Sequence, residues 1–155
     1  MKLKDEPFFV DTGKLLLRIA IGGLMLFHGI NKLQGGVGPV APAVQAHNLP
    51  SFVAYGVYIG EVLGPALVLI GLFTRCGALA MAINMAVAVW LVHTGDFNKL
   101  NPMSGAWALE LQALYFCGAL AIFFLGPGMF SVSGMFAGRN PPAEPPAQVP
   151  KTIVK

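Results

Sequence analysis

Four ionisable residues lie within or at the edge of stretches that are otherwise apolar: His28, Glu61, His93 and Glu110. Their neighbours are mostly Leu, Ala, Ile, Val, Gly and Phe. An ionisable group inside a membrane span is costly and marks a functional site by default. Carboxyl and imidazole groups can also exchange protons with a bound substrate. These four residues are therefore the first candidates for chemistry.

The composition indicates which elements position these residues. Of 155 residues, 55% are hydrophobic and 11% are charged, whereas a soluble domain carries about 25% charged residues. A membrane span needs about 20 apolar residues, and four segments qualify: 15–33, 52–73, 76–94 and 107–126. We therefore predict an all-α protein, a four-transmembrane-helix bundle in contact with the lipid bilayer, without room for a second domain.

The distribution of Lys and Arg predicts the orientation, because short cytoplasmic connections are enriched in them. One side carries Lys2, Lys4, Lys14, Arg18, Arg75, Arg139, Lys151 and Lys155, and the other carries Lys32 and Lys99. We expect both termini in the cytoplasm and a multi-pass location in a bacterial cytoplasmic (inner) membrane. The net charge of +3 then reflects topology, and no pattern indicates a nucleic acid partner.

Three parts are expected along the chain. Residues 1–13 form a cytoplasmic N-terminal segment, and the acidic Asp5, Glu6 and Asp11 favour a retained helix after it over a signal peptide. Residues 14–134 form the membrane domain, with an outer loop at 35–51 that is long enough to be functional or to fold back on the membrane. Residues 135–155 form a Pro-rich cytoplasmic tail, expected to be disordered.

The second apolar segment carries the most detailed pattern. Gly56, Gly60 and Gly64 share one helix face and predict close packing against another helix. Packing within the bundle is favoured, with a homo-oligomer as the alternative. Pro65 removes the amide that would bond to the carbonyl of Glu61. We therefore expect a helix bend and a polar pocket at the same point.

A helical rise of about 1.5 Å per residue estimates how deep the polar groups lie. It places His28, Glu61, Asn84, His93 and Glu110 in the outer half of the membrane. A bundle with these groups inside encloses a small cavity that opens outward. Glu61 is the deepest ionisable member and should be neutral unless a cation is near. His28 and Lys32 are four residues apart on one helix face, so both can address it.

The inner edge of the spans holds Arg18 and Arg75, whose long side chains are expected to snorkel toward water. Cys76 and Cys117 lie at different depths without a C-x-x-C motif and predict no disulfide. No metal is expected, because the Glu-x-x-His spacing of di-iron bundles is missing.

Less specific explanations exist for each candidate. Glu61 can tie helices together, and Asn84 can be a simple interhelical hydrogen bonder. Glu110 and His93 are near enough to the interface to be merely solvated. An aromatic belt accounts for Trp107. Tyr58 is retained as a site residue because it lies one turn before Glu61 on the same face.

Three runs of sequence resemble the DoxX family of small four-helix membrane proteins: Leu16-Leu17-Arg18 through His28-Gly29 to Lys32, Leu49-Pro50 through Glu61 to Gly71-Leu72-Phe73-Thr74-Arg75, and Gly126-Pro127-Gly128. The most specific part is Glu61 followed in order and spacing by Gly64, Gly71, Thr74 and Arg75. The resemblance covers residues 13–134. It departs from the family at residues 131–134, where relatives commonly have an Asp after the serine-containing turn.

The resemblance implies a membrane subunit of a thiosulfate:quinone oxidoreductase, or association with redox and oxidative-stress proteins. We therefore expect a quinone-linked redox subunit with a redox protein partner and no covalently bound cofactor. Glu61 and His28 are the expected catalytic, proton-exchanging groups at the quinone ring. The expected quinone-binding residues are Tyr58, Lys32, Asn84, His93, Trp107 and Glu110.

Two other functions stay open. A noncatalytic anchor or assembly subunit would use the polar residues only to hold its helices together. Proton-coupled transport of a small molecule is less favoured, because four helices without internal duplication give no evident alternating-access pair. The residues leave open whether the chain is itself part of an enzyme.

Overall fold

The structure, a computed structural model, describes residues 6–137, and within this part every regular element is helical. The elements are α1 (Glu6–Gly35), α2 (Ala41–Ala46), the 3-10 helix η1 (Ser51–Gly56), the π-helix η2 (Ile59–Leu63), α3 (Gly64–Ile70), α4 (Thr74–Val92), the 3-10 helix η3 (Thr94–Asp96), α5 (Glu110–Leu125) and α6 (Val132–Ala137). The predicted all-α fold is confirmed.

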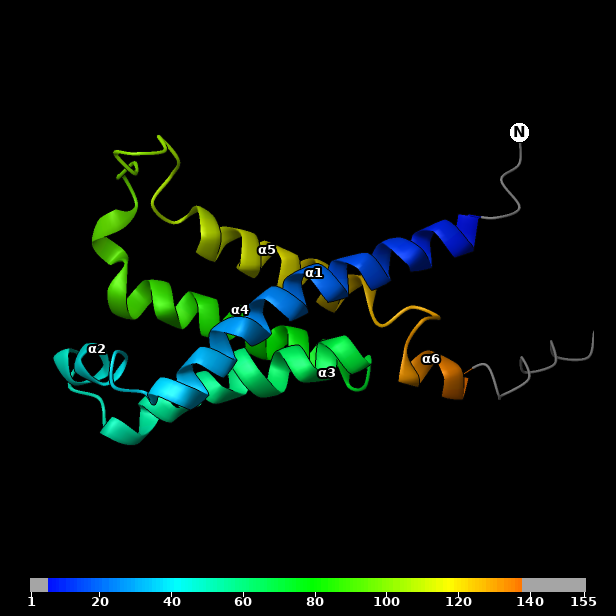
Figure 1. Cartoon of the computed structure of the whole chain (residues 1–155), viewed down its shortest axis with the longest axis horizontal. Coiled ribbons are helices and arrows are strands. Elements are labelled where there is room, and N and C mark those ends of the chain that lie inside the picture. The colour runs from blue at the N-terminus through cyan, green and yellow to red at the C-terminus, as the bar shows by residue number, and fades with distance from the viewer. Residues whose placement is uncertain (1–5, 138–155) are drawn as a thin grey trace, which may run out of the picture.

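The long helices run up and down in one bundle (Figure 1). Within the described part, three stretches are long and apolar enough to cross a membrane: Phe8–Gly35, Ser51–Ile70 and Thr74–Val92. The fourth, α5, is apolar but has 16 residues. It begins at Glu110 and not at the predicted residue 107, because Trp107 pairs with Leu100 in an isolated β-bridge and donates its indole N–H to the carbonyl of Phe97 at 2.8 Å.

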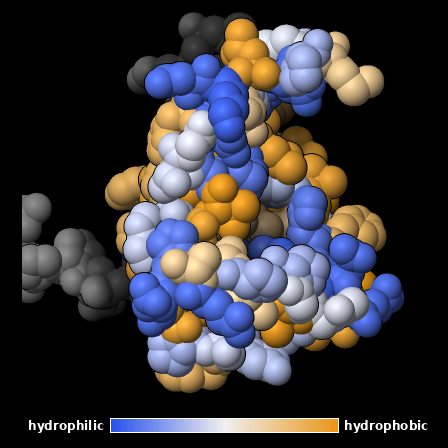
Figure 2. Space-filling view, turned by 90° about the vertical axis from the view of Figure 1, so that its left-hand side faces the viewer, coloured by the Kyte–Doolittle hydropathy of each residue, from blue (hydrophilic) through white to orange (hydrophobic). Residues whose placement is uncertain are grey.

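Both ends of the described chain lie at the same end of the bundle (Figure 1). The opposite end, called the loop end below, carries α2 and the 93–109 connection. Figure 2 views the molecule toward the loop end, where hydrophilic residues are spread among hydrophobic ones. The helix α6 covers residues 132–137, so the first residues of the predicted tail are helical, and residues 138–155 lie outside the described part.

The predicted glycine seam holds for two of its three members. A Cβ on Gly60 would lie 2.2 Å from the Cβ of Asn84, and one on Gly64 would lie 2.9 Å from the carbonyl oxygen of Gly77. Both glycines therefore let the second span approach α4 closely. Gly56 is exposed and has no neighbour within 4 Å of such a Cβ. The prediction was wrong there because residues 51–56 form a 3-10 helix, which breaks the 3.6-residue periodicity.

The expected irregularity at Glu61 takes the form of a π-helical turn. Gly64 donates its amide to the carbonyl of Ile59, five residues earlier, and Pro65 follows directly. The carbonyl oxygen of Glu61 is consequently left beside α1. A Cβ built on Gly29 of α1 would lie 2.0 Å from that oxygen. The contact of α1 with the π-helix therefore depends on the absence of a side chain at position 29.

We expect Gly29→Ala to destabilise the protein by at least about 2 kcal/mol, because overpacking forces neighbouring backbone apart. Gly23→Ala is the matched control, since a Cβ on Gly23 of the same helix meets nothing within 4 Å and alanine favours the helix by about 1 kcal/mol. Thermal unfolding of the two purified variants in detergent measures the difference. Equal midpoints for both would contradict the close approach.

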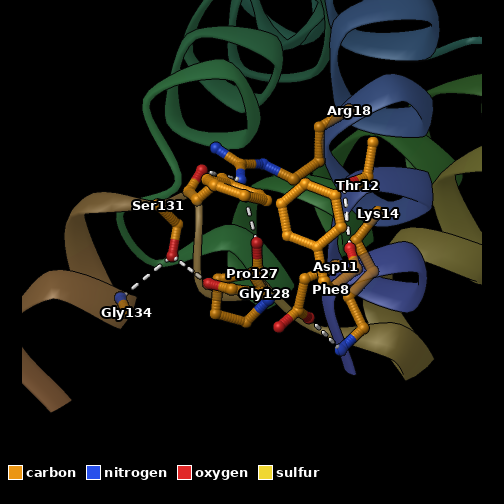
Figure 3. A network of polar contacts seen from close by, with 10 residues as sticks. Phe8, Asp11, Thr12, Lys14, Arg18, Pro127, Gly128, Ser131 and Gly134 are labelled. Atoms are coloured by element: carbon orange, nitrogen blue, oxygen red, sulfur yellow. Dashed lines mark hydrogen bonds and ion pairs between the residues drawn. The ribbon is translucent and has the colours of Figure 1, made fainter. Parts of the chain in front are cut away.

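Arg18 is buried, with 1% of its surface exposed, and does not snorkel as expected. Its guanidinium donates to four backbone carbonyls at 2.7 to 2.8 Å: Val68, Leu69, Pro127 and Phe130. The first two belong to the last turn of α3, where carbonyls have no intrahelical partner. Figure 3 shows the side chain reaching from α1 toward Pro127 and Ser131 in the segment after α5. The prediction failed because tertiary neighbours, and not water, satisfy this cation.

Candidate functional site

Glu61 is buried, with 4% of its surface exposed, and forms an ion pair with Lys32. The Lys32 ammonium donates to both carboxylate oxygens, at 2.6 Å to Oε1 and 2.5 Å to Oε2. Asn84 of α4 donates its Nδ2–H to Oε1 at 3.2 Å. Three segments far apart in the sequence thus meet at one carboxylate. The expected nearby cation is present, and it is Lys32.

A cavity of about 490 Å³ opens beside this carboxylate. Its polar lining side chains are those of Lys32, Glu61 and Asn84, and the rest of the wall is formed by the Gly, Pro, Ala, Val, Ile and Leu residues of α4, η1, η2 and the loop before α2. Val44 of α2 is buried and also lines it. The segment that contains Pro39, Val40 and Val44 therefore lies against the bundle, and the predicted polar pocket is an apolar cavity with one polar wall.

Tyr58 holds the pair from outside the cavity. Its hydroxyl donates to the backbone carbonyl of Lys32 at 3.2 Å and thereby fastens the end of α1 to the second span. The side chain is half-buried and is absent from the cavity lining. Tyr58 therefore positions Lys32.

His28 lies away from this cavity. Its side chain is exposed, and its ring packs edge-on against Tyr115 of α5, with ring centroids 5.7 Å apart. No hydrogen bond joins its imidazole to Glu61 within residues 6–137. The neighbour of His28 is Tyr115 of α5, and the neighbour of Lys32, one turn further along α1, is Glu61 of the second span, so the structure brings only one of the two expected cations to the carboxylate.

The other predicted site residues lie on the opposite side of α4. His93 Nδ1 is 3.0 Å from Asp96 Oδ2, and Lys99 donates to Asp96 Oδ1 at 2.8 Å. His93 Nε2 is 3.2 Å from Gln112 Nε2.

Trp107 and Gln112 line a second cavity, and Glu110 is exposed at the start of α5. The expected site is thus divided in two. Asp96 and Gln112 were not among the expected residues, although the successive i,i+3 spacing of residues 93, 96 and 99 could have indicated the ion pairs.

The carboxyl group of Asp96 has a lowered pKa, first because Lys99 donates a hydrogen bond to it and second because His93 does. A carboxyl whose pKa is lowered on folding stabilises the fold above its unfolded pKa and loses that contribution as the pH falls through the folded value. We expect Lys99→Gln to raise the pKa of Asp96, as carboxyl chemical shifts in a pH titration would show. A titration unchanged by the substitution would contradict this cause.

Fold and site together define a small helical membrane protein with an ion pair at the wall of an apolar cavity. The chain belongs to the DoxX family, whose model matches residues 13–94. This range includes the complete Lys32–Glu61–Asn84 cluster.

Two curated proteins are similar to the chain. An "Uncharacterized protein" of Haemophilus influenzae is 29% identical over 141 residues, which cover 86% of this chain and 94% of that protein. The Bacillus subtilis protein named "Putative oxidoreductase CatD" is 35% identical over 79 residues, which cover 51% of this chain and 58% of that protein. No solved structure matches the chain.

Proposed function

We propose that the chain is an integral membrane subunit of a quinone-linked redox system and binds a quinone ring in the cavity beside Glu61. The main observation in support is that Lys32, Glu61 and Asn84 form a polar wall in a cavity that is otherwise apolar. A quinone ring requires such a slot, with a few polar groups placed for its carbonyl oxygens. The name of the Bacillus subtilis relative, an oxidoreductase, supports a redox role.

The ion pair supplies suitable groups for the reaction. An ammonium has three N–H donors, and two of those of Lys32 point at Glu61, which leaves one for a quinone oxygen. Reduction of a quinone to a quinol takes up two electrons and two protons. In this proposal a redox protein partner supplies the two electrons, and the Lys32 ammonium gives one proton to the ring oxygen that it contacts. Water supplies the second proton to the other ring oxygen and returns a proton to Lys32 through Glu61. Glu61 is the proton-exchanging residue, and Lys32 takes the place expected for His28.

Titration of the purified protein with ubiquinone and menaquinone analogues tests the proposal. We expect saturable binding that Glu61→Gln weakens at least about tenfold, which corresponds to about 1.4 kcal/mol, the size of one hydrogen bond to a charged group. His28→Ala is the control, because His28 does not line the cavity. Absence of saturable binding, or equal affinity in Glu61→Gln, would overturn the proposal.

A noncatalytic assembly subunit is the second candidate, and one observation favours it. The Lys32–Glu61–Asn84 cluster joins α1, the second span and α4, as polar groups that fix helix packing do. If this is its whole role, quinones do not bind at all, while Glu61→Gln still lowers stability and the recovery of any complex.

We also infer that both termini face the cytoplasm of a bacterial inner membrane, so that the cavity lies in the outer half. The excess of Lys and Arg on one side supports this orientation. Green fluorescent protein fused to the C-terminus folds in the cytoplasm, so it should fluoresce. Alkaline phosphatase at the same position should be inactive, and the reverse result would refute the orientation.

A further inference from the structure

A second cavity, of about 450 Å³, lies between α4 and α5 near the loop end. It shares no lining residue with the cavity at Glu61. Thr94 and Gln112 are its polar lining residues, and the remainder are Met85, Ala86, Val89, Trp90, Phe97, Trp107, Leu109, Ala113 and Phe116. A ligand of this cavity must therefore be almost entirely apolar.

The lining residues of the cavity follow α4 and α5 along the helix axes. The α4 wall extends from Met85 to Trp90, and Thr94, after the end of that helix, also lines the cavity. At about 1.5 Å per residue the α4 wall is about 7.5 Å long, and the α5 wall from Leu109 to Phe116 is about 10 Å long. Because membrane-spanning helices lie roughly along the bilayer normal, the slot runs parallel to the lipid chains around it. An acyl chain can enter it from the surrounding bilayer without turning.

Charged residues lie next to the lining residues at the loop end: Asp96 precedes Phe97, Glu110 follows Leu109, and the backbone carbonyl of Lys99 accepts from the amide of Ala108. Lys99 is exposed and paired with Asp96, and Glu110 is exposed directly after the lining residue Leu109. Both oxygens of Asp96 already have partners, Oδ1 in Lys99 and Oδ2 in His93, so among the described residues Glu110 is the carboxylate left for the cation of a ligand. An anionic headgroup would add a further negative charge here. A zwitterionic headgroup matches better, since its ammonium can meet a carboxylate and its phosphate can meet Lys99.

We propose that this cavity binds one acyl chain of a phosphatidylethanolamine molecule whose headgroup lies at Asp96, Lys99 and Glu110. Its primary ammonium has three N–H donors, which the Glu110 carboxylate can accept. The quaternary ammonium of phosphatidylcholine has none, and phosphatidylglycerol carries net negative charge. The headgroup therefore determines which lipid is selected, and the apolar slot holds the chain.

The chain contains two tryptophans, and both line this cavity. Both are also partly exposed, so their fluorescence reports the contents of the cavity above a background from the bulk lipid. The full-length protein is reconstituted in phosphatidylcholine vesicles that contain a small, equal fraction of either phosphatidylethanolamine or phosphatidylglycerol with brominated acyl chains, which quench tryptophan on contact. We expect brominated phosphatidylethanolamine to quench roughly fivefold more than random mixing gives, the preference that one headgroup ion pair produces.

Two substitutions on neighbouring residues of α5 test the location. Ala113→Phe fills the cavity and should reduce the excess quenching to the level of random mixing. Leu114→Phe adds a similar ring on an exposed position of the same helix and should leave the excess unchanged. Quenching by random mixing in the wild-type protein, a preference for phosphatidylglycerol, or full excess quenching in Ala113→Phe would each overturn the proposal. Displacement of the brominated lipid by a short-chain benzoquinone would also overturn it.

Discussion

Methionine in place of Arg18 is expected to prevent stable folding of the bundle. The substitution keeps the apolar volume of the stem but leaves four carbonyls without the donors that they have now. Each buried polar group without a partner costs about 1 to 3 kcal/mol. The sum is comparable to the total stability of a typical domain, about 5 to 15 kcal/mol. The measurement is the yield of monodisperse protein in detergent, followed by unfolding in SDS.

Arg18→Lys separates the charge from the geometry of the guanidinium. An ammonium has three donors and cannot reach four carbonyls that approach from two segments, so we expect an intermediate loss. Arg75→Met is the control, because Arg75 is exposed and surface substitutions change stability by about 0.5 kcal/mol or less. Wild-type stability in Arg18→Met would show that the carbonyls find other donors.

Breaking the pair of Lys32 and Glu61 is expected to have the second-largest effect. Either Glu61→Gln or Lys32→Met should cost about 3 kcal/mol, the lower end of the range for a buried ion pair. The lower end applies because a quarter of the Lys32 side chain is exposed, 25% against 6% for Glu61, and solvent screens its charge. The double variant should recover most of the loss, because it leaves no unpaired charge.

The same three variants distinguish a binding site from a helix tie. If the pair binds a quinone, the double variant regains stability but no affinity. Gly23→Ala, which meets no neighbour, provides a control with unchanged affinity. Stability is followed by thermal unfolding and affinity by quinone titration. A double variant that binds as tightly as the wild type would exclude these side chains from the site. Additive destabilisation in the double variant would show that the two residues do not interact across the helices.

The membrane class, the family and the approximate positions of the spans could be predicted because they depend on local patterns. Apolar length fixes where a span is possible, and Pro65 after Glu61 fixes where its backbone is irregular. Glu61 could be identified in the same way, since a carboxyl group within a membrane span is energetically costly and therefore indicates a functional or structural role. The predicted helix ends were less accurate. The helix α5 begins three residues later than predicted because Trp107 bonds to the 97–100 loop, and such a contact between separate segments is not visible in the local pattern.

The sequence by itself determined that this protein is a helical membrane protein with a carboxyl group inside the bundle, because hydrophobicity and helical period are properties of consecutive residues. Only the tertiary structure decided which partner that carboxyl group has. His28 and Lys32 lie one turn apart on the same face of α1, and the neighbour packed against that face differs from one turn to the next: Tyr115 of α5 at His28 and Glu61 of the second span at Lys32. The burial of Arg18 was likewise decided by carbonyls that lie 50 and 109 residues away in the chain. Both contacts join residues that are far apart in the chain. Such residues meet only when the helices pack against one another, so the local sequence pattern does not predict the contact.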